Sequence, residues 1–285
     1  IRYYRGVSQL YDGRDVNTGT ALFAQCSRGV HQGDGAGMAY FSCGMDAALT
    51  KLRAEFPDCL VMAYADDIVM DCPGDARTPV TSDLPALGLA PNNDMPTAAA
   101  FIQRGKIIAG EMCGLEVRLD KCYATSVGSK LNQAEYGVME VREGLLVMGV
   151  PIGNLEWERR TCKEIADGVA DVYKAARRAE TKQATQLLSA YCGGVPCINH
   201  LLRATEVEVT AEACESVDAA TTESLCAQLG VSRLTDSESD QCSLPIRHGG
   251  LGYRRASEKA DAALLGGFTC AAYKGFGIGD IDPDL

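Results

Sequence analysis

Residues 59–70 read Cys59-Leu60-Val61-Met62-Ala63-Tyr64-Ala65-Asp66-Asp67-Ile68-Val69-Met70, so two adjacent carboxylates stand between two short apolar runs. Such runs around a polar pair are typical of two strands joined at a hairpin tip. Adjacent like charges repel, and a hard cation such as Mg²⁺ would relieve that repulsion. A two-metal site at the tip would support an in-line phosphoryl displacement. The alternative is a solvated turn, because Asp is common in turns.

The sequence before residue 152 alternates strand and helix patterns around this hairpin. Apolar residues spaced by three, four and seven predict a helix that Pro57 ends: Met38, Phe41, Met45, Ala48, Leu49 and Leu52. We predict a turn over 11–15, strands over 21–26, 59–64, 68–71, 115–119 and 144–152, and a helix over 97–113. The proline-rich stretch 72–96 is predicted to be a long irregular connection.

After Pro151 the pattern becomes helical. One apolar face contains Cys162, Ile165, Val169, Val172 and Ala176. Further helices are predicted over 181–192, 208–229 and 256–272, with a polar loop over 236–243. The sequence therefore predicts an α+β fold with two domains, residues 1–152 and residues 153–285.

The overall charge does not favour a nucleic-acid binder. The 285 residues carry a net charge of −11, with a sequence pI of about 4.8. Phosphate contacts need Lys and Arg. Local basic groups remain, one at Arg159-Arg160-Lys163 and one at Lys174, Arg177, Arg178 and Lys182. The second group is spaced for a helix that tracks a duplex backbone, or for an ordinary solvated face.

Thirteen cysteines occur, most of them within apolar patterns. Residues 1–5 lack the apolar core of a signal peptide, and no window reaches the roughly 18 to 20 apolar residues of a membrane span. We therefore expect reduced cysteines in an intracellular protein of the nucleus or cytoplasm, without a membrane segment. Cys192, Cys197 and His200 form part of a zinc pattern, but no fourth ligand follows at a standard spacing.

Five motifs in order resemble those of reverse transcriptases from non-LTR retrotransposons. Arg28–Asp34 followed by a helix is similar to motif B, and Tyr64–Asp67 to motif C. Gly114–Cys122 is similar to motif D, and Val147–Gly153 to motif E, the primer grip. The stretch from Leu244 to Gly252 resembles a Leu-Pro…Gly-Gly-Leu-Gly signature that follows the thumb. The resemblance spans nearly the whole chain and implies a palm, an antiparallel sheet with packed helices, over 1–152. It implies a helical thumb and connection region over 153–285.

The resemblance also implies residue roles. Asp66 would bind both catalytic Mg²⁺ or Mn²⁺ ions, with Asp67 supporting the metal site. Lys121 would lie near the triphosphate or protonate the leaving pyrophosphate; otherwise it is a solvated surface lysine. Tyr64 and Ala65 would line the site near the primer end. Gln32 and Gly33 would shape the site for the template and the incoming nucleotide. Met148 and Gly149 would form the primer grip.

The implied reaction is RNA-templated DNA synthesis by two-metal nucleotidyl transfer, with an RNA template, a DNA primer and deoxynucleoside triphosphates as partners. Two departures stand out: Gly35 replaces the family's Pro, and no Asp matches motif A, since Asp12 and Asp15 lie too close to Gln32. We therefore expect a polyprotein fragment that begins after motif A, lacks the fingers and is inactive alone. Alternatives are a non-catalytic remnant and an RNA-templated RNA polymerase. Ala65 favours reverse transcriptase, because RNA-templated RNA polymerases usually have Gly at the position before the two Asp residues.

Overall fold

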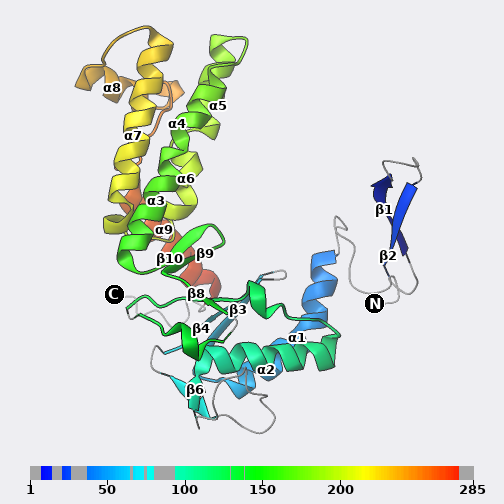
Figure 1. Ribbon diagram of the computed structural model, residues 1–285. Coiled ribbons are helices and arrows are strands. Elements are labelled where there is room, and N and C mark those ends of the chain that lie inside the picture. The colour runs from blue at the N-terminus through cyan, green and yellow to red at the C-terminus, as the bar shows by residue number, and fades with distance from the viewer. Residues whose placement is uncertain are drawn as a thin grey trace. The chain divides into compact units, whose positions relative to one another are not determined.

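The computed structural model describes residues 8–14, 21–26, 37–64, 67–73, 76–79, 94–128, 130–137 and 139–275. The chain divides into two compact units, residues 1–124 with 132–141 and residues 125–131 with 142–285. The described elements mix helices with small sheets, as expected for an α+β protein (Figure 1).

Two helices and short antiparallel ladders build the first unit. α1 (Gly37–Glu55) packs on α2 (Thr97–Cys113), and both match the predicted helices. Apart from Gly37, the buried residues of α1 are Met45, Ala48, Leu49 and Leu52, whereas Met38 is exposed. After α1, the Phe56 ring packs edge-on against Phe101 of α2. This apolar contact fixes the chain just before the strand that leads to the Asp pair.

The strands of the first unit pair in two-stranded ladders. β1 (Ser8–Arg14) pairs with β2 (Ala21–Cys26), β3 (Leu60–Tyr64) with β4 (Asp67–Asp71), and β5 (Arg77–Pro79) with β6 (Asp94–Pro96), all antiparallel. β7 (Tyr123–Ala124) and β8 (Glu140–Val141) pair in parallel. The turn predicted over 11–15 is wrong for its first four residues, because these belong to β1. The strand has a β-bulge or similar irregularity there, since its register with β2 shifts between Tyr11 and Gly13. The connection predicted over 72–96 contains the β5–β6 pair.

The strand predicted over 115–119 is also wrong. α2 ends at Gly114, whose φ of 65° is left-handed, and the Leu115 N–H returns to the Ala109 carbonyl. The chain then pairs with none of the described strands and runs into a 3₁₀ turn, Leu119–Lys121. A second such turn, Gln133–Glu135, precedes β8. Apolar alternation over five residues cannot make a strand where no neighbouring strand offers hydrogen bonds.

The second unit opens with a hairpin and continues in helices. β9 (Gly144–Val147) pairs with β10 (Val150–Gly153). The helices are α3 (Leu155–Asp167), α4 (Val169–Ala176), α5 (Lys182–Cys192), α6 (Val195–Leu202), α7 (Val207–Leu229), α8 (Asp236–Ser243) and α9 (Ala260–Gly275), with a 3₁₀ turn over Ile246–His248. The predicted helices at 181–192 and 208–229 are confirmed, and the helix predicted over 256–272 is present as α9, which begins four residues later, at Ala260. The loop predicted over 236–243 is wrong: it is α8, which begins at a capping box of Thr235 and Glu238.

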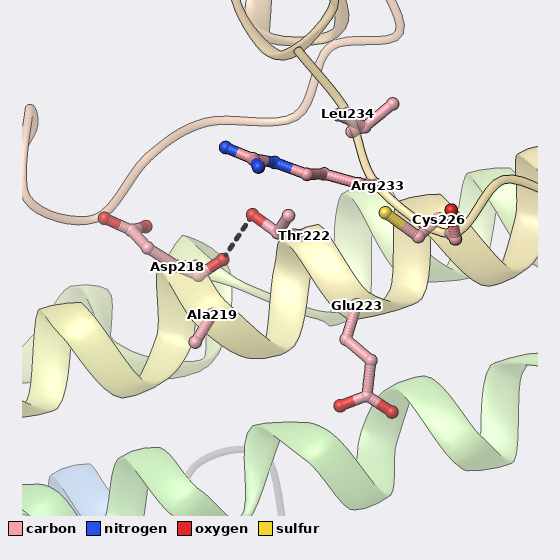
Figure 2. Close-up of a pocket in the computed structure, with 8 residues that line it drawn as sticks. Asp218, Ala219, Thr222, Glu223, Cys226, Arg233 and Leu234 are labelled. Atoms are coloured by element: carbon pink, nitrogen blue, oxygen red, sulfur yellow. Dashed lines mark hydrogen bonds between the residues drawn. The ribbon is translucent and has the colours of Figure 1, made fainter. Parts of the chain in front are cut away.

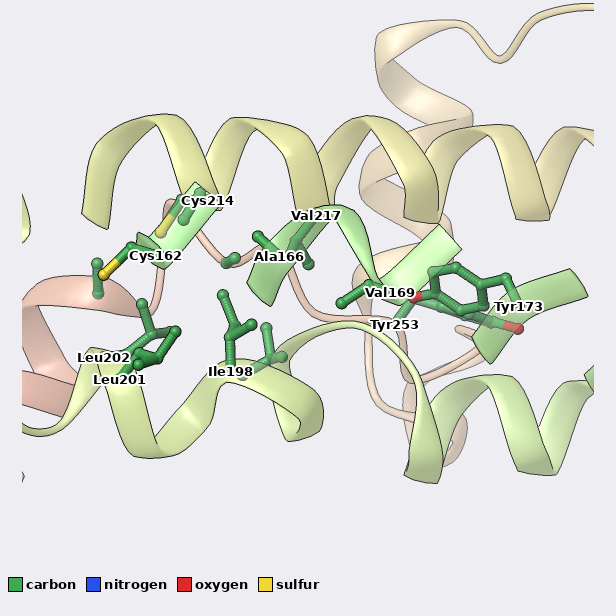
Figure 3. Close-up of a cluster of buried hydrophobic side chains, with 14 of the residues drawn as sticks. Cys162, Ala166, Val169, Tyr173, Ile198, Leu201, Leu202, Cys214, Val217 and Tyr253 are labelled. Atoms are coloured by element: carbon green, nitrogen blue, oxygen red, sulfur yellow. The ribbon is translucent and has the colours of Figure 1, made fainter. Parts of the chain in front are cut away.

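The core of the second unit lies where α3 and α4 pack along α7 and α6 closes one side. Figure 3 shows Cys162 and Ala166 of α3 near Cys214 and Val217 of α7, with Ile198 projecting toward them from α6. All five side chains are at most 2% exposed. The predicted apolar face that begins at Cys162 is therefore the core face, although it spans two helices that meet at Gly168.

Candidate nucleotidyl-transfer site and basic surface

The β3–β4 hairpin holds the motif from which the sequence argument began. Tyr64 pairs with Asp67 at the end of the antiparallel ladder, which agrees with the predicted hairpin. Asp67 is exposed and is the first residue of β4. Ala65 and Asp66 lie outside the described residues, and Tyr64 is described by its backbone alone. The ladder thus places Asp67 at the tip end of a regular hairpin.

One face of this hairpin is buried at Val61, whereas Ala63, further along the same face of β3, is exposed. Val61 is 5% exposed, while its neighbours Leu60 and Met62 on the other face are 56% and 48% exposed. α1 contacts β3, and its Arg53 Nη2 donates to the Val61 carbonyl over 3.2 Å. Because α1 packs on β3 at Val61, the face of β3 that carries Leu60 and Met62 is left exposed.

The remaining site residues of the first unit are partly described. Gln32 and Gly33 lie outside the described residues; α1 begins at Gly37. Lys121 is exposed at the end of its 3₁₀ turn, beside an exposed ion pair of Arg118 and Asp120 at 2.6 Å. An exposed ammonium group next to a paired Asp is free to meet a triphosphate.

The predicted primer grip is the turn of the β9–β10 hairpin. The strand predicted over 144–152 is wrong in its middle, because Met148 and Gly149 take φ values of 53° and 82° and reverse the chain. Positive φ at both central residues is the geometry of a type I′ turn, which matches the twist of the flanking strands. Met148 is 58% exposed. The turn therefore presents a large apolar side chain to solvent.

Sequence reasoning missed His200 as a neighbour of this turn. A Cβ built on Gly149 would lie 3.5 Å from both Cδ2 and Nε2 of His200, which is on α6. Nothing in the local sequence signals this contact, since it arises only when α6 packs against β10. His200 is also part of the partial zinc pattern. In that pattern, the Cys197 thiol is engaged in a hydrogen bond, which it donates to the Cys192 carbonyl over 2.8 Å.

The signature near residue 250 has a backbone explanation. Gly249 and Gly252 each have a φ of 77°, a conformation that favours glycine. A Cβ on Gly250 would collide with Leu244, whose carbonyl accepts the Gly252 N–H over 2.9 Å. The glycines therefore let the segment fold back on the end of α8.

A metal at the hairpin would have to use Asp67. Its exposed carboxylate has the oxygen chemistry that Mg²⁺ and Mn²⁺ prefer, and it makes no ion pair with any residue that the structure describes. Asp67 thus fits such an ion as one ligand. Within the described ranges, no cluster of three or more His, Cys, Asp or Glu side chains could hold a metal.

The two predicted basic groups differ in their partners. On α3, Arg160 pairs with Glu143 at 3.3 Å and Lys163 with Asp167 at 2.7 Å. Around the α4–α5 turn, Lys174 pairs with Asp171. Its neighbours Arg177, Arg178 and Lys182 are exposed and make no ion pair with the described part of the chain. We call these three residues the α4–α5 basic turn.

A shallow surface hollow lies along α7 of the second unit. Asp218, Thr222, Glu223 and Cys226 of α7 line it together with Arg233 (Figure 2). The Thr222 hydroxyl donates to the Asp218 carbonyl over 2.9 Å, as the dashed line shows. The hollow is open and is lined by side chains of both charges, Asp218, Glu223 and Arg233, and this arrangement does not indicate a catalytic site.

Comparison with known proteins points to mobile elements. The chain is 26% identical, over 262 residues and 88% of its length, to the retrotransposable element SLACS 132 kDa protein of Trypanosoma brucei gambiense. It spans 19% of that protein's length. No family model and no solved structure matches. The likeness supports a retrotransposon origin for the chain. In the ranges that the structure covers, no helix combines the length and apolarity needed to cross a bilayer.

Proposed function

We propose that this chain is part of a retrotransposon reverse transcriptase that performs RNA-templated DNA synthesis by two-metal nucleotidyl transfer. The observation that carries the proposal is the β3–β4 hairpin, whose ladder closes at Tyr64 and Asp67 around the Tyr-Ala-Asp-Asp sequence. The likeness to a retrotransposon protein supports it. In this proposal the first unit contains palm elements and the helices of the second unit belong to the thumb.

Asp66 and Asp67 would hold the Mg²⁺ or Mn²⁺ ions. Such ions, when bound, activate the primer 3′-hydroxyl and balance the charge that develops on the phosphates. Lys121 would contact the triphosphate, because its ammonium group is exposed and phosphate oxygens accept from Lys. Gln32, Gly33, Tyr64 and Ala65 would shape the nucleotide and template site.

The second unit would hold the nucleic acid. The turn at Met148 and Gly149 would contact the primer, where an exposed Met on a tight turn offers an adaptable apolar surface. The α4–α5 basic turn would contact backbone phosphates. The partners are then an RNA template, a DNA primer and deoxynucleoside triphosphates, within a larger polyprotein of the nucleus or cytoplasm.

Primer extension tests the proposal. The chain is expressed within the reading frame that encodes it, and a labelled DNA primer on an RNA template is extended with Mg²⁺ or Mn²⁺. We expect extension with deoxynucleotides, and a loss of at least about a hundredfold in Asp66→Asn and Asp67→Asn, because each removes a charge that places the reactants. Asp71→Asn is the matched control, since Asp71 is exposed at the far end of β4.

Three outcomes would contradict the proposal. Activity that survives Asp66→Asn would place the chemistry elsewhere. Extension with ribonucleotides in preference to deoxynucleotides would favour an RNA-templated RNA polymerase. A folded protein without activity on any template would favour a non-catalytic remnant.

A further inference from the structure

Two cysteines meet at the base of the β3–β4 hairpin, at the opposite end from Asp67. Leu60 pairs with Asp71 there, so Cys59 and Cys72 are the next residues outward on the two strands. Burial raises the pKa of both thiols, that of Cys72 to about 11. Each thiol also affects the pKa of the other, so the two side chains are neighbours.

The backbone geometry suits a covalent link between them. Residues that face each other across antiparallel strands have Cα atoms about 4.5 to 5.5 Å apart. A disulfide accepts Cα separations of about 4.4 to 6.8 Å when the two Cβ atoms converge. Continuing the Leu60–Asp71 register by one residue sets Cys59 opposite Cys72, and opposed residues of an antiparallel pair carry their side chains on the same face, with Cβ atoms about 4.5 to 5.5 Å apart.

The start of α2 lies beside Cys72. The backbone N–H of Ala98, in the first turn of α2, lowers the pKa of Cys72 and partly opposes the larger effect of burial. Cys72 therefore lies next to the start of a helix as well as at the hairpin base.

Two other pairs of neighbouring cysteines among the described residues lack this combination of contact and access. Cys162 and Cys214 lie near each other but are 0% and 2% exposed. The Cys197 thiol near Cys192 is engaged with a backbone carbonyl. Cys59 and Cys72 are both half-buried, so a small oxidant can reach them.

We propose that Cys59 and Cys72 form a reversible disulfide that staples the base of the β3–β4 hairpin. With a disulfide oxidant such as glutathione disulfide, the two thiols lose two protons and two electrons and form one S–S bond. The oxidant's own S–S bond breaks, and two glutathione thiols result. The link would hold β3 and β4 together at the end that carries no Asp pair, and would reduce local opening of the hairpin.

A redox titration tests the proposal on the whole chain. The protein is equilibrated in graded mixtures of reduced and oxidised glutathione, quenched with acid, alkylated and mapped by mass spectrometry. We expect a Cys59–Cys72-linked peptide that is lighter by two hydrogens and appears while Cys43 remains alkylated. We also expect amide exchange in β3 and β4 to slow by about tenfold or more after oxidation.

Matched variants make the result specific. Cys72→Ala should abolish both the linked peptide and the slower exchange, whereas Cys43→Ala, at an exposed position on α1, should change neither. If the Cys72→Ala variant does not fold, the wild-type protein is treated instead with phenylarsine oxide, a reagent that binds two close thiols. This reagent should protect Cys59 and Cys72 together from alkylation. Oxidation of other pairs while these two stay alkylated would overturn the proposal, as would a link without slower exchange.

Discussion

At the scale of single residues, Asp67 combines exposure with a fixed backbone. It is the first residue of β4 and pairs with Tyr64, so its position is set by the ladder. Its carboxylate is exposed and has no ion-pair partner among the residues with described positions. A carboxylate held on regular backbone and left unpaired is suited to binding a cation.

We expect weak Mn²⁺ binding at this hairpin, with a dissociation constant of about millimolar, because two carboxylates offer few of the oxygens that a hard cation takes. Asp66→Asn and Asp67→Asn should each weaken it further, since an amide carries no charge. Titration calorimetry measures the affinity, with Asp71→Asn as the variant that should behave like the wild type. A micromolar affinity would show that more ligands take part.

At the scale of elements, Tyr173 joins α4 to α7 and to the loop between α5 and α6. It is 1% exposed, and its hydroxyl lies 2.8 Å from the Thr221 Oγ1, which in turn donates to the Val217 carbonyl. A Cβ on Gly194 would lie 2.8 Å from the Tyr173 hydroxyl. The helices therefore close around a buried phenol that has a hydrogen-bond partner.

Tyr173 should make the second unit sensitive to alkali. Burial raises its pKa to about 12, whereas an unfolded Tyr titrates near about 10. The raised pKa of this neutral acid contributes stability that is fully present below about pH 10 and is lost as the pH rises toward about 12. Tyr173→Phe should cost about 1 kcal/mol at neutral pH, from the lost hydrogen bond, and should flatten the alkaline decline.

The measurement is urea unfolding at neutral and alkaline pH, followed by the fluorescence of Trp157, the one tryptophan of the chain. Tyr191→Phe is the matched control, because Tyr191 is 71% exposed and should change little. An alkaline decline in Tyr173→Phe as steep as in the wild type would show that another group is responsible.

At the scale of the whole molecule, charge decides how nucleic acid can bind. The net charge of −11 repels a polyanion, so binding must depend on local basic residues. The α4–α5 basic turn offers Arg177, Arg178 and Lys182 without ion pairs to described residues, while Arg160 is paired with Glu143. Unpaired cations can neutralise phosphates without first breaking an ion pair.

Binding to a primer–template duplex should therefore be weak and steeply salt-dependent. The double variant Arg177→Ala/Arg178→Ala should lower affinity at low salt and reduce the slope of log affinity against log salt by about two, roughly one for each lost phosphate contact. Arg160→Ala should alter the slope less. Filter binding at several salt concentrations measures both quantities, and tight binding that is indifferent to salt would contradict the phosphate-contact account.

The sequence by itself determined the long helices and the hairpin at the Asp pair. Helices at 97–113, 182–192 and 207–229 agree with prediction because a helix that buries one face repeats its apolar residues in the local sequence. The hairpin agrees because two apolar runs around a polar pair can form a ladder with each other alone. α8 also had a local signal, its capping box, which its polar composition obscured.

Only the tertiary structure decided the features that depend on distant partners. The run over 115–119 has no strand beside it in the part of the chain that the structure describes, and the run over 144–152 reverses at Met148, because strand formation needs a hydrogen-bonding partner that periodicity does not specify. Which arginines are paired, which residue packs against Gly149 and which cysteines meet across β3 and β4 follow from contacts between residues far apart in the chain. Local sequence cannot encode these contacts, since each depends on how whole elements pack.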